Sequence, residues 1–133
     1  MITMKTKTVF ISFIIFLFFG FATNTLADSK KIAVAATEAE KTASISKQAG
    51  RAPFFLFFDE SGNFLEAVKN PARDLPGGAG QCTASFIAGK GATLIIAGHI
   101  GYKMKQALKE YHIQHREETG VAYDVVQTII QNR

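Results

Sequence analysis

The stretch "PFFLFFDESGNFLEAVKN", residues 53–70, contains two strand patterns joined by a short turn. Its first part, 53–60, is a run of aromatic and apolar residues of the kind enriched in buried strands. Residues 61–63, Ser-Gly-Asn, have turn composition, and 64–70 then alternates apolar and polar side chains like an exposed strand. The stretch therefore predicts an antiparallel hairpin, around which the remaining elements must be arranged.

Outside this hairpin, short apolar runs alternate with helical patterns. The further elements that we expect are strands at 30–37, 92–98 and 112–117, and helices at 81–89, at about 102–111 and from about 122 onward. Helical crossovers make the fourth and fifth strands parallel to the third, whereas the hairpin makes the second strand antiparallel to its neighbours. The pattern therefore predicts an α/β sandwich, a mixed five-stranded sheet with helices on its faces.

Three connections are expected at one rim of this sheet. The polar loop 38–52, the glycine-rich turn 71–80 and the segment 98–101, "GHIG", all follow strands of one direction, and ligands usually bind outside such carboxyl ends. Two helices also begin there, and their free backbone N–H groups favour an anion. The loop 38–52 is long enough to act as a lid. The glycines predicted to line the binding site are Gly77, Gly78, Gly80, Gly98 and Gly101.

Two side chains at this rim could bind a metal directly. Cys82 falls near the start of the helix expected at 81–89, where the dipole favours a thiolate, and His99 lies in the other connection. A cysteine and a histidine suit a soft or borderline metal. Simpler interpretations stay open, since Cys82 could pack inward against Phe86 and His99 could face solvent. Glycines are also common in such connections only because the turns are tight.

The first residues have the three parts of an export signal. Lys5 and Lys7 precede an apolar run at 9–22, and small residues then allow cleavage after Ala27. The run is short for a membrane helix, which needs about 20 residues. We therefore expect a signal peptide at 1–27 and a periplasmic or secreted domain at 28–133. An uncleaved membrane anchor is the alternative.

Composition and motifs narrow the class of protein. The net charge is +4, two lysines of the leader contribute to it, and the other basic residues are scattered, so nucleic acid is not an expected partner. The single cysteine excludes an intramolecular disulfide. Gly-x-Ser-x-Gly, His-Glu-x-x-His and Walker motifs are absent from the sequence. Cys82 and His99 could act as a nucleophile and its base, but no third residue that would orient the base can be named. We therefore expect that the protein is not an enzyme.

Five segments resemble a known family when they are read in order: "KIAVA", "ISKQAGRAPFFLFFDESG", "NP", "GGAG" and "IIAGHIGYKMKQAL", followed by a last helix. Together they cover about 30–130 and are similar to the dinitrogenase iron–molybdenum cofactor biosynthesis family, which includes NifX, NafY and the C-terminal part of NifB. The resemblance implies a ribonuclease H-like sandwich. It also implies a noncatalytic carrier that binds a metal–sulfur cluster and exchanges it with a donor or recipient protein.

The chain departs from this family at two points. Where the family has His-Phe-Gly, with a candidate ligand histidine, this sequence has Gln48, Ala49 and Gly50, so Gln48 takes the place of the ligand. An export signal also does not suit nitrogen fixation, which is intracellular. We therefore expect an exported carrier of a metal or metal–sulfur cluster, with Cys82 and His99 as replacement ligands. The alternative is a periplasmic binding module for a small organic anion or a protein partner, without metal.

Overall fold

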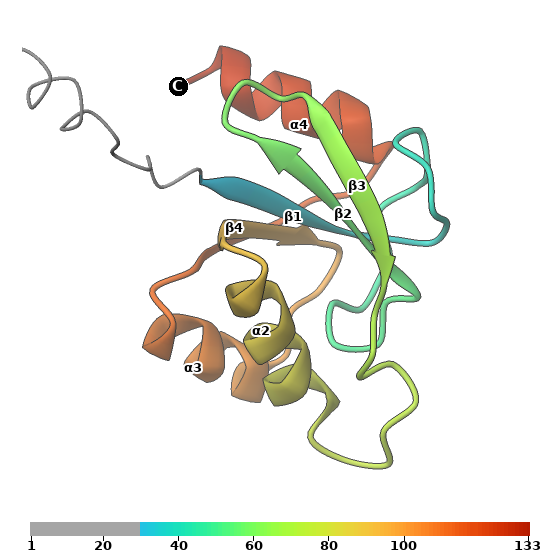
Figure 1. Ribbon diagram of the computed structural model, residues 1–133, viewed down its shortest axis with the longest axis vertical. Helices are drawn as coiled ribbons and strands as arrows, with labels where there is room; N and C mark the ends of the chain where they lie inside the picture. Colours follow the sequence, from blue (N-terminus) through green and yellow to red (C-terminus); the bar gives the residue numbers. More distant parts are fainter. Residues whose placement is uncertain (1–29) are drawn as a thin grey trace, which may run out of the picture.

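The computed structural model describes residues 30–133. Five strands and three helices follow one another in the order expected from the sequence (Figure 1). Their bounds are β1 Lys31–Ala36, β2 Phe54–Asp59, β3 Phe64–Lys69, α2 Ala79–Gly89, β4 Ala92–Ala97, α3 Tyr102–Glu110, β5 Gln114–Glu117 and α4 Ala122–Gln131. The signal peptide expected at 1–27 lies outside the described residues.

The sheet is mixed, as predicted, with the strand order β3-β2-β1-β4-β5. β2 pairs antiparallel with both β1 and β3, whereas β4 is parallel to β1 and to β5. Strands β1, β3, β4 and β5 therefore all run in the same direction. Their carboxyl ends meet at one rim, which places the three connections singled out above next to one another.

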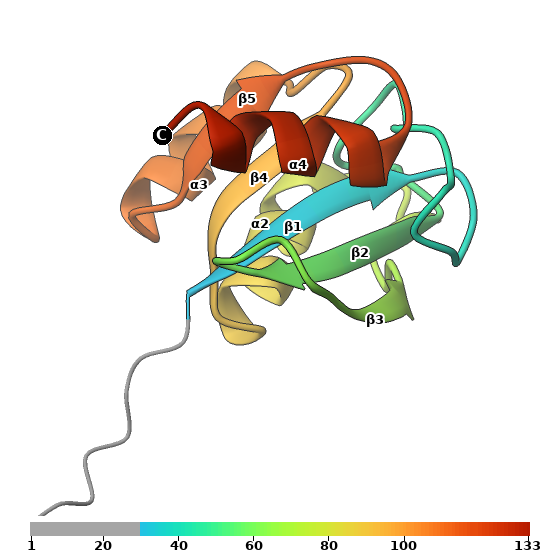
Figure 2. The same ribbon diagram turned by 90° about the horizontal axis from the view of Figure 1, so that it is seen from above.

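Each face of the sheet has its own apolar core, because successive side chains of a strand point to opposite faces. Ala33, Phe57 and Ile95 lie beneath α2 and α3 on one face, and Phe55 shares this core. Val34, with its neighbours on the other face, packs against α4. The helices thus cover both faces, two on one and one on the other, and the domain has three layers (Figure 2).

The turn of the β2–β3 hairpin is stabilised by the carboxylate of Asp59. Its Oδ1 accepts the backbone N–H groups of Ser61 and Asn63, each at 2.9 Å, and its Oδ2 accepts the Asn63 amide at 3.1 Å. The bonds from Asn63, backbone and side chain, lower the pKa of Asp59 below its ordinary value of 3.8, with smaller help from Ser61 and Gly62. Hydrogen bonds of this kind favour the ionised form.

This turn should make part of the stability depend on pH. Because the folded pKa of Asp59 lies below the unfolded one, its contribution is fully present above pH 3.8 and is lost as pH falls through the folded value. We expect Asp59→Asn to be less stable than the wild type at pH 7, with the difference shrinking toward pH 3. Urea unfolding at both pH values measures this, and a constant difference would contradict it.

The second half of the loop 38–52, residues 43–52, forms a fixed wall (the loop wall), so the expectation of a lid is wrong for this half. Ser46 donates its N–H to Ala35 of β1, and Ile45 donates its own to Gly120. Ala43, Ala49 and other apolar residues of this segment are buried. A segment with buried side chains and backbone bonds to two parts of the fold does not open readily. The polarity of the sequence concealed these contacts.

Candidate functional site

A cavity of about 460 Å³ lies at the carboxyl rim, between the loop wall, α2 and α3. The wall contributes residues 48–51, α2 contributes its first two residues, and the β4–α3 connection with the start of α3 completes the lining. The lining residues are Gln48, Ala49, Gly50, Arg51, Ala79, Gly80, His99, Gly101, Tyr102, Lys103 and Met104. The three connections that the sequence places at one rim therefore converge on one cavity.

Backbone bonds join the loop wall to the β4–α3 connection. Gly98 donates its N–H to Ser46, and Ala49 donates to the carbonyl of His99, both at 2.9 Å. Gln48 and His99 form a parallel bridge between these bonds. The contact is close, since a Cβ at Gly98 would lie 2.9 Å from the Cα of Lys47. The wall and the connection thus behave as an extension of the sheet.

Glycine also lets α2 approach both neighbours. A Cβ at Gly50 would lie 3.0 Å from the Cα of Gly80, and one at Gly80 would lie 3.0 Å from the Cβ of Met104. The helix starts at Ala79, two residues earlier than expected, after Gly78 with φ 74°, a left-handed conformation that suits glycine. Gly80 therefore belongs to the first turn, where its backbone faces the cavity lining.

A small buried polar network fixes α2 against the wall. The hydroxyl of Thr83 donates to the carbonyl of Gly50 at 3.0 Å and lies 3.3 Å from Oδ1 of Asn70. Asn70 in turn donates its amide to the same carbonyl at 3.2 Å. Both side chains are buried and fully paired. They join the end of β3, the loop wall and α2 at a single backbone oxygen.

Cationic side chains and helix N–H groups lie together at this cavity. Neither α2 nor α3 has a side-chain cap at its N-terminus, so the first N–H groups of each helix are available to a ligand. Arg51, Lys103 and His99 add cationic or donor side chains to the lining. Arg51 also donates through Nη1 to the carbonyls of Arg73 and Leu75, each at 2.9 Å. These bonds hold the loop between β3 and α2 in place.

Glu117 is a residue of this rim that sequence reasoning missed. It ends β5, and its Oε2 accepts the N–H of Ile100 at 2.9 Å. The same oxygen lies 3.4 Å from Nδ1 of His99 and 3.8 Å from Nζ of Lys105. The bond from Ile100, followed by the charges of Lys105 and His99, lowers the pKa of Glu117 below 4.5. Its place at the carboxyl end of a parallel strand was the signal.

The predicted site residues divide into two groups. Gln48, Gly80, His99 and Gly101 line the cavity, whereas Gly77, Gly78, Gly98 and Cys82 do not. Gly98 packs against the backbone of Ser46 and Lys47, and Cys82 is exposed on α2. Within residues 30–133, no three His, Cys, Asp or Glu side chains are close enough together to hold a metal ion.

A second hollow, of about 550 Å³, lies between α4 and β5. It contains none of the predicted site residues. Glu118 and Asp124 line it and balance the charges of Arg116 and Arg133, and Asp124 in the first turn of α4 already matches the helix N-terminus there with a carboxylate. The cavity at the carboxyl rim therefore suits an anionic ligand better.

The fold and this cavity define a class: a three-layer α/β domain whose carboxyl-rim cavity combines helix N-termini with cationic side chains. Residues 30–132 match the family described as dinitrogenase iron-molybdenum cofactor. The chain belongs to this family, as the resemblance of its sequence implied.

Solved structures agree with this assignment. The apo form of the orange protein from Desulfovibrio gigas is 28% identical with a TM-score of 0.73, over 77% of this chain and 88% of that one. A putative NifB protein from Thermotoga is 26% identical with a TM-score of 0.65, over 77% and 89%. A putative dinitrogenase from Methanocaldococcus jannaschii, 14% identical with a TM-score of 0.52 over 80% and 92%, shares the fold alone.

Two further findings concern relatives and membrane helices. None of the curated proteins matches this chain. Among the helices of residues 30–133, none combines the length and the apolar character that crossing a membrane requires.

Proposed function

We propose that this protein is a noncatalytic carrier of an anionic metal–sulfur cluster, which it binds in the cavity at the carboxyl rim. One observation carries the proposal: two helix N-termini without side-chain caps open on a single cavity that Arg51 and Lys103 also line. Membership of a family described by the iron–molybdenum cofactor supports a cluster as cargo. Backbone N–H groups and cations complement an anion without any covalent step.

The lining suits such a cargo in a second way. Ala79, Gly80 and Met104 provide small or apolar surface, which excludes water and strengthens electrostatic attraction. His99 supplies one imidazole for a direct bond to a metal of the cluster. Gln48, at the position where the family has a ligand histidine, lines the same cavity. We propose that His99 takes over the role that Gln48 cannot perform.

The charge of α3 should matter for cargo binding. Lys103 is in the first turn of α3 and lines the cavity, so Lys103→Glu reverses a charge beside the cluster. We expect the affinity for a cluster reconstituted anaerobically from iron and sulfide to fall about tenfold, or about 1.4 kcal/mol. Absorption spectroscopy with metal quantification measures it. Lys31→Glu, the same charge change at the amino end of β1 and so at the opposite end of the sheet, is the control, and equal losses in both variants would count against the cavity.

The two predicted metal ligands give a separate test. His99 lines the cavity and Cys82 does not, so we expect His99→Ala to lower cluster retention and Cys82→Ala to leave it unchanged. The same anaerobic reconstitution applies to both proteins. Retention that depends on Cys82 but not on His99 would move the site out of this cavity.

A second function stays in consideration because the cavity lining offers one imidazole and no thiol. Such a donor set also fits a small organic anion held without metal. Protein purified anaerobically from its native compartment separates the two functions. Bound metal with cluster absorption supports the carrier, whereas a colourless, metal-free protein supports the organic anion.

Two finer assignments belong with this proposal. The strand order, with β2 as the antiparallel strand among the five, supports a ribonuclease H-like fold. We also propose that residues 1–27 direct export, which would separate this carrier from nitrogen fixation. Export of this kind predicts cleavage after Ala27, which mass determination of the mature protein tests.

A further inference from the structure

We propose that Glu117 is the positioning residue of the cavity: its carboxylate orients the imidazole of His99 so that Nε2 is offered to the cargo. The inference rests on the proposed function for its purpose. The contact between Glu117 and His99 is observed whatever the cargo is. Glu117 does not itself line the cavity, so we infer that it acts through His99.

The position of the carboxylate is set by the sheet. Glu117 is paired with Ala97 in the parallel ladder of β4 and β5, and the next residue, Glu118, donates its N–H to the carbonyl of Ala97 at 2.9 Å. The Oε2 atom accepts the N–H of Ile100 at 2.9 Å. Since Ile100 is itself buried, the oxygen is held between a strand and the turn that carries His99.

His99 is contacted from two sides, and its side chain remains 70% exposed. Its carbonyl accepts the N–H of Ala49, which ties its backbone to the loop wall. Its Nδ1 lies 3.4 Å from Oε2 of Glu117, while Nε2 has no hydrogen-bond partner among residues 30–133. A carboxylate beside Nδ1 favours the tautomer with the proton on that nitrogen, which leaves the lone pair on Nε2. Carboxylates orient metal-binding histidines in the same manner.

The competing explanation is that Glu117 only closes the turn through Ile100. Glu117→Gln separates the two roles, because an amide oxygen can still accept the N–H of Ile100 but carries no charge toward Nδ1. Glu118→Gln is the matched control. Glu118 is the adjacent carboxylate and pairs with Arg116 at 3.4 Å, away from His99.

The first measurement reads the tautomer of His99 by nitrogen NMR near pH 8, without any cargo. We expect the wild type and Glu118→Gln to hold the proton mainly on Nδ1, and Glu117→Gln to shift a large share to Nε2. An unchanged tautomer in a folded Glu117→Gln protein would overturn the inference.

The second measurement uses the cluster reconstituted anaerobically from iron and sulfide. We expect Glu117→Gln to weaken retention about tenfold, as loss of an outer-shell partner commonly does. In the His99→Ala background the same change should have no further effect, whereas a purely structural role would add to it. If the wild type binds no cluster, the proposed function fails, and the tautomer result alone decides the role of Glu117.

Discussion

Replacement of Gly98 by valine should lower the free energy of unfolding by about 2–3 kcal/mol, the upper part of the range for an overpacked site. A Cβ at this position would lie 2.9 Å from the Cα of Lys47 and 3.0 Å from the carbonyl oxygens of Ser46 and Lys47. These are backbone atoms, so no side-chain rotation relieves the clash. The wall must separate from β4, which also endangers the bond from Gly98 N–H to Ser46.

Urea unfolding of the purified protein measures this effect. Gly77→Val is the matched control, because a Cβ at Gly77 would meet no atom within 4 Å. We expect the control to change stability by less than about 0.5 kcal/mol. Since the wall carries part of the cavity, the Gly98 variant should also retain less cluster. Equal stability of the two variants would show that the wall is not held against β4.

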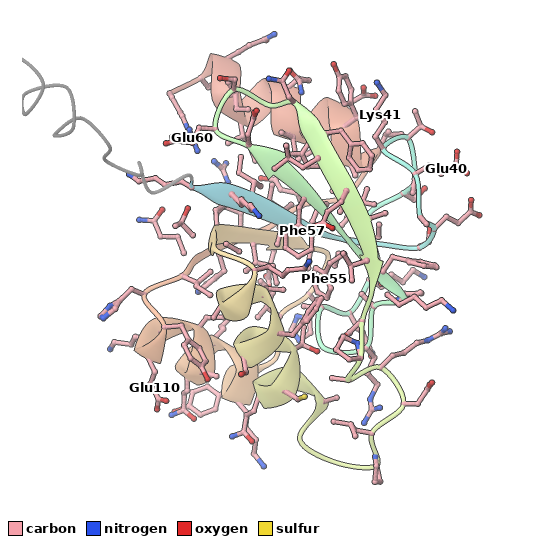
Figure 3. All side chains as sticks on the ribbon, viewed as in Figure 1. Glu40, Lys41, Phe55, Phe57, Glu60 and Glu110 are labelled. Carbon is pink, nitrogen blue, oxygen red and sulfur yellow. The ribbon has the colours of Figure 1, made fainter. Side chains whose placement is uncertain are left out.

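Phe57→Ala should be more damaging still, with a loss of about 3–5 kcal/mol. Phe57 is fully buried in the core beneath α2, and Figure 3 shows it beside Phe55 between the sheet and that helix. Its ring packs edge-on against Phe86, with centroids 6.3 Å apart. Truncation removes a large apolar surface and leaves a cavity in the layer that supports α2.

Phe64→Ala is the control for this second prediction. Phe64 lies on the edge strand β3 and is 37% exposed, so its truncation should cost clearly less than that of Phe57. Chemical unfolding of both variants supplies the comparison. A similar loss for both would mean that the buried face of β2 does not dominate the stability of the domain.

The fold was predictable because its elements carry local signals. The apolar run of β2, the Ser-Gly-Asn turn and the alternation of β3 define a hairpin from neighbouring residues alone. Crossover helices then dictate parallel pairing of the later strands, and the structure has this topology. The family resemblance is confirmed independently over 30–132.

The site was predictable only in part, because its walls depend on long-range contacts. Residues 43–52 have no periodic pattern, and the backbone bonds that place them, from Ile45 to Gly120 and from Ala49 to His99, go to partners far away in the chain. Arg51 therefore gave no local signal of its role, and Glu117 was marked only by its position at the carboxyl end of β5. Cys82 shows that one position along a helix decides which way a side chain points. Its neighbour Thr83 is buried, whereas Cys82 is turned about 100° away from that direction.

For the proposed carrier, the tie between residues 46–49 and the β4–α3 connection also bears on how quickly cargo would be exchanged. A receptor whose walls are already in place loses little conformational entropy on loading, so its affinity is not reduced by ordering a flexible segment. Loading then requires only an encounter at the open mouth, and the residence time follows from the strength of the bonds inside. Hand-over to an acceptor would proceed by competition for the cargo rather than by a hinge motion of the carrier.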